Sequence, residues 1–98
     1  MIKDFNYPKA IQQANAIANA ATQLRNLANG QYEQAIGEVQ NAWAGDTARA
    51  FLQQCMETKR ELLKKAQELD ELANAIRKIA KRIEDAEQEA RRIAKANG

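Results

Sequence analysis

The chain has 98 residues, of which 45% are hydrophobic and 29% are charged, and its formal net charge is +2. Much of the hydrophobic fraction is alanine, which favours long helices packed closely side by side in one domain, 1–98, over a thick globular core. The absence of histidine and serine excludes Ser-His catalysis and most zinc sites, so we expect no enzyme, no catalytic residue, no metal and no cofactor.

Basic and acidic residues are interspersed instead of forming a basic stripe, so no nucleic-acid partner is expected. The first residues, MIKDFNYPKAIQQ, lack the apolar core of a cleaved signal peptide. No run of apolar residues approaches the roughly 20 that span a bilayer, and acids interrupt the basic C-terminal helix, so no stable membrane insertion is expected.

The first predicted element is a helix over about residues 8–42, preceded by a short extended arm over residues 1–7. Pro8 suits the first helical turn, where its missing N–H costs nothing. Apolar residues then recur at spacings of three and four, which predicts one buried face. Gly30 and Gly37 interrupt this helix, and we expect them to permit a close helix approach or a slight bend. The predicted face comprises Ala10, Ile11, Ala14, Ile17, Ala18, Ala21, Leu24, Ala28, Tyr32, Ala35, Val39 and Ala42.

The predicted bend covers residues 43–45, Trp43-Ala44-Gly45. Glycine readily takes the left-handed conformation that ends a helix. Asp46 or Thr47 offers a side-chain oxygen to cap the next helix, and Asp46 also places negative charge at its positive end. Trp43 has two open roles, which can coexist: it closes the end of the core, or it forms a recognition surface.

The second predicted helix, about residues 46–96, carries an apolar stripe that is wider than a two-stranded seam requires. In heptad notation, positions a and d are mostly apolar, and alanine recurs at position e. This width is typical of a helix with two neighbours, whereas a lone hairpin supplies only one. We therefore predict a dimeric four-helix bundle with Cys55 packed as a small, buried hydrophobe. The predicted core and dimer stripe comprises Phe51, Cys55, Leu62, Leu69, Leu72, Ile76, Ile79 and Ile83.

The two helices differ in length, so part of the second must extend past the first. At 1.5 Å per residue, the lengths before and after the bend are roughly 50 and 75 Å. About the last 18 residues are expected to have no partner within the hairpin.

The chain length, the central Trp43-Ala44-Gly45, the Phe51 that follows and the helical heptads on both sides resemble the WXG family. These are small helical proteins exported by bacterial type VII secretion systems. The resemblance implies an all-α antiparallel hairpin with the W-x-G at its bend, dimerisation into a four-helix bundle, and secretion without a cleaved leader. It also implies that Trp43 and Gly45 belong to a surface recognised by the secretion ATPase.

The family's tail patterns are absent, because neither Tyr7 nor Tyr32 has an acid four residues on and the chain has no histidine. Ile83 with Glu87 is a weak substitute, and the cluster of Lys81, Asp85, Glu89 and Arg92 has spacings common in any charged helix. The partner is a second copy or a related hairpin. Two other interpretations remain open: a heterodimeric targeting partner of a larger LXG-type toxin or effector, and a plain structural coiled coil.

Overall fold

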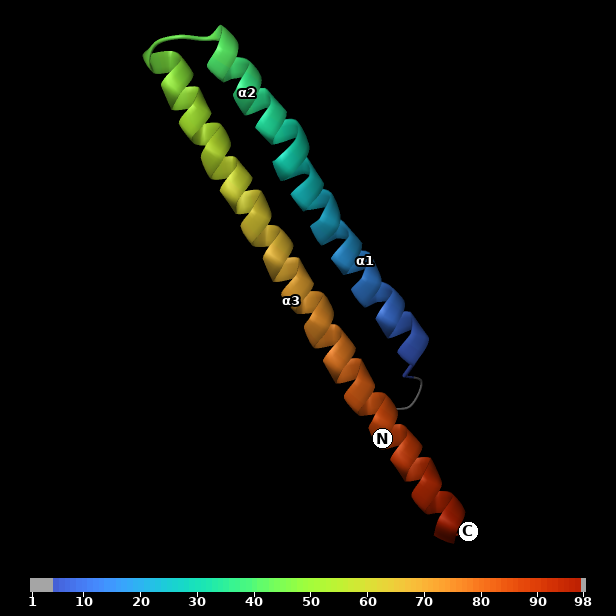
Figure 1. Ribbon diagram of the computed structural model, residues 1–98. Coiled ribbons are helices and arrows are strands. Elements are labelled where there is room, and N and C mark those ends of the chain that lie inside the picture. The colour runs from blue at the N-terminus through green and yellow to red at the C-terminus, as the bar shows by residue number, and fades with distance from the viewer. Residues whose placement is uncertain (1–4, 98) are drawn as a thin grey trace.

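The computed structural model describes residues 5–97, which form a helical hairpin 79 Å long. The first arm consists of α1 (Tyr7–Asn26), a π-helix (Leu27–Tyr32) and α2 (Glu33–Ala42), and the second arm is the single helix α3 (Asp46–Asn97). The two arms run antiparallel and are joined by a short bend (Figure 1). The prediction of an all-α hairpin is confirmed.

The first arm begins where its sequence provides both a cap and a proline. The Asn6 side chain accepts a hydrogen bond from the Lys9 backbone N–H at 3.0 Å, and Pro8 occupies the first turn. This satisfies one of the free N–H groups at the helix start. The predicted extended segment covered residues 1–7, but Tyr7 is already helical. Residues 1–4 of that prediction lie outside the described residues.

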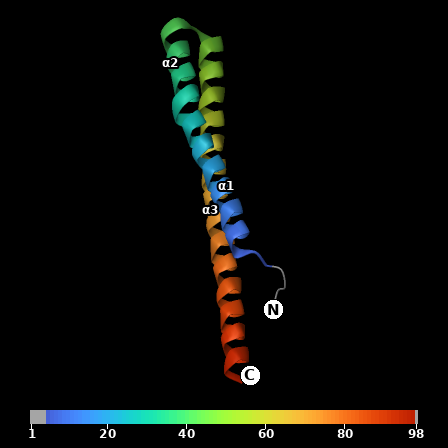
Figure 2. The ribbon, with the colours of Figure 1, turned by 90° about the vertical axis from the view of Figure 1, so that its right-hand side faces the viewer.

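A seam of small residues holds the two arms together. Three alanines on α1 and the π-helix, seven residues apart, are fully buried, and three on α3 with the same spacing are at most 2% exposed. Methyl groups at these positions let the helices lie side by side, as both ribbon views show (Figures 1 and 2). We call this set the alanine seam: Ala14, Ala21, Ala28, Ala66, Ala73 and Ala80.

One side of the alanine seam is polar. Arg25, Asp70 and Arg77 each follow a seam alanine by four positions and bridge the arms, as in the ion pair between Arg25 and Asp70. Arg77 donates to Asn15 at 2.8 Å, and Lys59 pairs with Glu33 nearer the bend. These groups are partly exposed, so each bridge contributes at most about 1 kcal/mol. Because these bridging groups are polar and partly exposed, this side of the alanine seam faces solvent.

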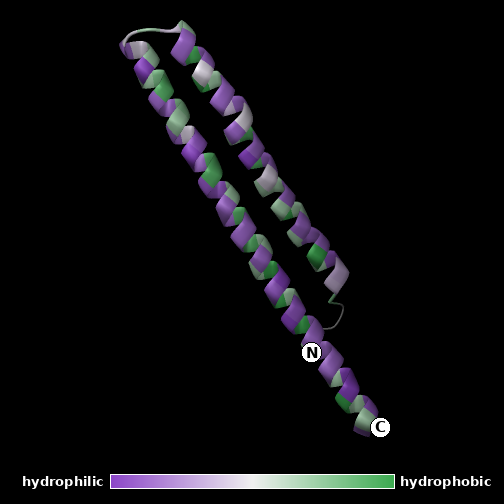
Figure 3. Cartoon of the chain, in the orientation of Figure 1, coloured by the Kyte–Doolittle hydropathy of each residue, from purple (hydrophilic) through white to green (hydrophobic). Residues whose placement is uncertain are grey.

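The other side of the seam is apolar. Residues that follow the seam alanines by three positions, such as Leu24, Leu69 and Ile76, are half-buried. Further round α3, Leu72 and Ile79 are 49% and 56% exposed. In Figure 3 hydrophobic residues recur along the ribbon of α3 between hydrophilic ones. We call this surface the apolar face: Ile17, Leu24, Leu27, Phe51, Cys55, Leu62, Leu69, Leu72, Ile76, Ile79 and Ile83.

One part of the wide apolar stripe of α3 therefore faces the first arm, and the other part faces away from it. Its e positions, Ala66, Ala73 and Ala80, pack on the first arm, whereas its d positions, Leu72 and Ile79, point away from it. One neighbour accounts for only part of the stripe. The uncovered part is available to a second neighbour.

The π-helix changes the buried face of the first arm. The burial spacing of seven residues from Ala14 to Ala28 is followed by a step of eight to Ile36, which is 7% exposed. The predicted face is therefore wrong at Ala35 and Ala42, which are exposed, and it omitted Ile36. A π-turn inserts one extra residue and rotates everything after it. Sequence periodicity without the partner helix cannot locate this insertion.

The expected close approach at Gly30 and Gly37 is also wrong. A Cβ atom at either position would meet nothing within 4 Å. Gly30 lies inside the π-helix instead, where a residue with a low helix propensity tolerates a departure from α geometry.

Deleting Gly30 should leave the hairpin intact. The step from Ala28 to Ile36 would become seven residues, so Ile36 would keep its inward position in a continuous α-helix. Loss of a mid-helix glycine should leave the free energy of unfolding unchanged or raise it by about 1 kcal/mol. Urea denaturation followed by circular dichroism measures this.

Deletion of the exposed Gln67 is the control for the Gly30 deletion, because α3 has no π-turn that could absorb the lost residue. It would turn Ala73 and Ala80 off the seam relative to Ala66, and we expect a loss of about 3 kcal/mol or more. Equal destabilisation by both deletions would contradict the role assigned to the π-helix.

The C-terminal end of α3 extends past the first arm (Figure 1). Ile83 and Glu84 are half-buried, Glu87 is only 8% exposed, and every residue of 88–97 is exposed. We call residues 88–97 the overhang. It is shorter than the predicted 18 residues because burial continues to Glu87, close to where Phe5 and Tyr7, also half-buried, begin the first arm. Within residues 5–97, no helix has both the length and the apolarity needed to cross a membrane.

Candidate functional site

The bend combines an extended tryptophan with a left-handed glycine. The Trp43 N–H donates to the Val39 carbonyl at 2.9 Å and closes the last turn of α2. Trp43 itself is extended (φ −108°, ψ 148°), so its side chain leaves the helical path. Gly45 has φ +90°, a conformation that strains residues with a Cβ atom. The chain thus reverses within residues 43–45.

The start of α3 places Asp46 and Thr47 at the bend. The Arg49 N–H donates to the Gly45 carbonyl at 3.2 Å, which closes the first turn. The Asp46 carboxylate accepts a hydrogen bond from the Arg49 guanidinium. Among the described residues, neither Asp46 nor Thr47 accepts a backbone hydrogen bond through its side chain. Asp46 therefore acts on the helix by its charge in the first turn.

Trp43 and Phe51 form an exposed aromatic pair. Their ring centroids are 5.4 Å apart at an interplanar angle of 33°, and the side chains are 52% and 44% exposed. Val39 and Ala48, at 8% and 4%, are the buried residues of this end. The end of the hairpin core is closed by small and branched residues, while the two aromatic rings lie on its surface.

The predicted core and dimer stripe lies on the apolar face instead of inside the hairpin. Phe51, Leu72 and Ile79 are exposed. Its other five residues are half-buried: Cys55, Leu62, Leu69, Ile76 and Ile83. Cys55 thus is not fully buried in the hairpin, and its thiol borders a cavity of about 340 Å³.

A family model described as WXG100, "Proteins of 100 residues with WXG", matches residues 4–88, which include the bend and both arms. The chain belongs to the WXG100 family. No curated protein and no solved structure matches it. The WXG100 family consists of small secreted helical proteins associated with type VII secretion, which typically form helical dimers and are not known as enzymes.

The two candidate export residues of this WXG100 chain, Ile83 and Glu87, are largely covered instead of exposed. Ile83 is half-buried. Glu87 continues the seven-residue spacing of the alanine seam, and its carboxylate lies 3.6 Å from the Arg91 guanidinium. A buried carboxylate requires such a partner to offset its desolvation. The exposed surface at the C-terminal end of α3 is formed mainly by residues other than Ile83 and Glu87.

Exposed ion pairs cover the outer side of the WXG100 tail. A hydrogen bond to Asp85 at 2.8 Å raises the pKa of Lys81. The Arg92 guanidinium donates to Glu89, which lowers the pKa of that carboxyl and raises the pKa of Arg92. Each of these pKa shifts favours the charged form of its group: Lys81, Glu89 or Arg92.

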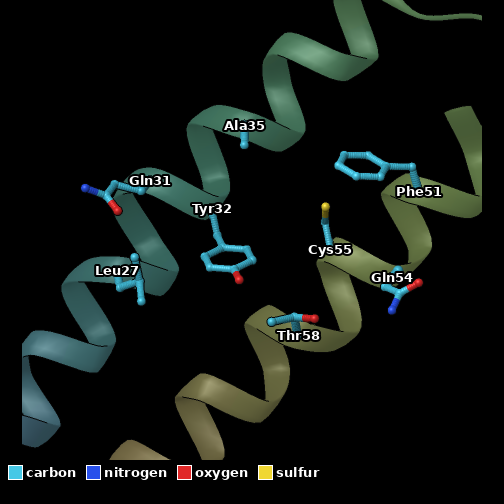
Figure 4. Close-up of a pocket in the computed structure, with 8 residues that line it drawn as sticks. All are labelled: Leu27, Gln31, Tyr32, Ala35, Phe51, Gln54, Cys55 and Thr58. Atoms are coloured by element: carbon cyan, nitrogen blue, oxygen red, sulfur yellow. The ribbon is translucent and has the colours of Figure 1, made fainter.

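The structure adds Leu27 to the residues that periodicity singled out, and it places Tyr32, predicted on the buried face of the first arm, at a cavity of the apolar face. Leu27 and Tyr32 approach Cys55 and Phe51 across the apolar face and line the cavity (Figure 4). Leu27 follows Leu24 by three positions, a spacing that could have singled it out. The aromatic bend and the apolar face are the two exposed apolar surfaces of this WXG100 hairpin described so far.

Proposed function

We propose that this protein is a non-enzymatic substrate of a type VII secretion system, exported as a helical dimer, and that the secretion ATPase recognises its bend. The observation that carries the proposal is the position of Trp43, half-exposed beside Gly45 at the reversal of a two-helix hairpin. A large aromatic side chain in that position contributes little to the hairpin core. Exposed aromatic residues are typical anchors of binding surfaces.

The apolar face supports the dimer. A hairpin alone leaves Leu72 and Ile79 about half exposed along a continuous stripe. Covering apolar surface is worth roughly 25 cal/mol per Å², and contiguous apolar patches of this kind mark interaction sites. The polar bridges on the opposite side of the seam leave the apolar face as the surface for a second hairpin.

Replacing Ile79 with arginine should convert the dimer into monomers. We expect light scattering of the wild-type protein, purified alone, to give twice the 11.0 kDa of one chain. A guanidinium on the apolar face would be desolvated without a partner in the dimer, which strongly opposes association. The mass of Ile79→Arg should therefore fall to that of one chain, while its helical content is retained.

The matched control for Ile79→Arg is Gln67→Arg, which adds the same charge at an exposed position on the outer face of α3. It should remain dimeric. A wild-type protein that is a folded monomer would overturn the homodimer. That outcome would favour the role of a heterodimeric partner for a larger toxin or effector.

A further inference from the structure

The polar side of the alanine seam becomes partly apolar near the bend. Farther from the bend, Asp70 and Arg77 occupy one heptad position of α3 and bridge the arms. Closer to the bend, the same heptad position holds Leu63 and Met56. Leu63 is half-buried and Met56 is 47% exposed. Two apolar side chains thus replace the polar bridges over this part of the hairpin.

These two side chains border a groove between α2 and α3, with a volume of about 350 Å³. Clefts of this size, lined by apolar side chains and a few polar groups, are typical of binding sites. The groove shares no lining residue with the cavity beside Cys55, which opens on the apolar face. Apart from one glutamine, its lining consists of Ile36, Met56, Leu63, Glu33, Lys59 and Arg60.

The charged residues of the groove leave one positive charge unbalanced. The Lys59 ammonium and the Glu33 carboxylate form an ion pair between the arms. Arg60 is exposed, and among residues 5–97 no carboxylate forms an ion pair with it. A carboxylate on a ligand therefore pairs with Arg60 without displacing the bridge between Lys59 and Glu33. Guanidinium and carboxylate groups form strong, directional hydrogen bonds.

We propose that this groove binds an acidic amphipathic helix of a partner protein. Apolar side chains of the partner contact Ile36, Met56 and Leu63, and a carboxylate beside them pairs with Arg60. A groove between two helices suits a third helix, whose apolar residues recur at spacings of three and four. The inference goes beyond export and does not require the dimer, because the groove and the apolar face lie on opposite sides of the alanine seam.

Charge disfavours the overhang of a second copy as the occupant of the groove. Residues 88–97 include three basic residues and one acidic residue. A basic helix would bring its cations against Lys59 and Arg60, and like charges across an interface oppose binding. An acidic helix of a different protein has the complementary charge.

Two synthetic peptides of about 15 residues, a length at which isolated helices begin to form, test the groove. Both carry leucines at spacings of three and four, but one has glutamates at the flanking positions and the other has lysines. Amide chemical shifts of the isotope-labelled full-length protein locate each peptide. We expect the glutamate peptide to shift amides around Ile36 and Leu63, and the lysine peptide to bind about tenfold more weakly.

The substitution Arg60→Glu should reverse the preference between the two peptides. Affinity for the glutamate peptide should fall about tenfold, and affinity for the lysine peptide should rise. Arg60 is exposed, so the substitution should leave the hairpin folded. The matched control is Arg92→Glu, which makes the same change on the exposed overhang and should leave both affinities as in the wild type.

The substitution Met56→Ala should weaken both peptides, because it removes apolar contact area from the groove. Recognition by the secretion ATPase is proposed to involve Trp43 and not this groove. Peptide binding and export of Met56→Ala therefore measure two different surfaces.

Three outcomes would overturn the acidic helix as the occupant. The first is equal binding of both peptides to the wild type, and the second is no binding of either peptide at about 1 mM. The third is a set of shifts centred on Leu72 and Ile79, which would place the peptide on the apolar face. None of these outcomes bears on export, so failure of the groove is distinguishable from failure of recognition at Trp43.

Discussion

Replacing Ala21 with aspartate should unfold the hairpin or lower its free energy of unfolding by about 3 kcal/mol or more. Ala21 is fully buried at the centre of the alanine seam. Its methyl group lies where two helices come close together, so a carboxylate there would be desolvated without a partner. Urea denaturation monitored by circular dichroism at 222 nm, a standard helix wavelength, measures the change.

Ala16→Asp is the matched control for Ala21→Asp. It makes the same substitution on the same helix at an exposed position, and surface substitutions usually change stability by less than about 0.5 kcal/mol. Comparable losses for both variants would contradict the conclusion that the alanine seam holds the arms together. The expected difference arises from burial alone, because helix propensity is the same for both.

Replacing Trp43 with alanine should abolish most export while changing stability little. The indole is 52% exposed and its main aromatic contact is Phe51, so we expect a loss of about 1 kcal/mol, the value of one aromatic pair. A fully buried tryptophan would cost about 3–5 kcal/mol. Loss of an aromatic anchor at a binding surface typically costs about 2 kcal/mol of binding, or roughly thirty-fold in affinity.

Export and stability must be measured on the same Trp43→Ala protein. Secreted and cell-associated amounts give export, and urea denaturation gives stability. Met56→Ala is the control, because Met56 is 47% exposed near the same end but does not belong to the aromatic pair. If Trp43→Ala loses 3 kcal/mol or more and its export falls only in proportion, Trp43 is a core residue. If both variants are exported normally, the bend is not the recognition surface and the structural coiled-coil interpretation gains support.

The helical secondary structure of both arms and the position of the bend could be predicted from the sequence by itself. Both depend on local properties: alanine, glutamate and lysine favour helix over long stretches, and Gly45 ends one without strain. The heptad pattern of α3 also predicted correctly that its stripe is too wide for one neighbour. These conclusions need no knowledge of what each helix packs against.

Only the tertiary structure decided which part of each stripe faces which neighbour. Periodicity identifies an apolar side of a helix, but Ala73 and Leu72 are adjacent in sequence and both qualify for the core. Ala73 is buried because two backbones approach most closely over a methyl group, and the larger Leu72 is left on the outside. Packing geometry, and not hydrophobicity, separates them.

The π-helix and the exposure of Trp43 likewise depend on the partner arm. The extra residue near Gly30 is tolerated because Ile36 and Val39 then pack against α3. The apolar pattern of one helix considered alone carries no information about this packing. The sequence left two roles open for Trp43, and in the structure Val39 and Ala48 are the buried residues of this end while the indole is half-exposed. The sequence determined where the chain turns, and contact between the arms determined what the turn exposes.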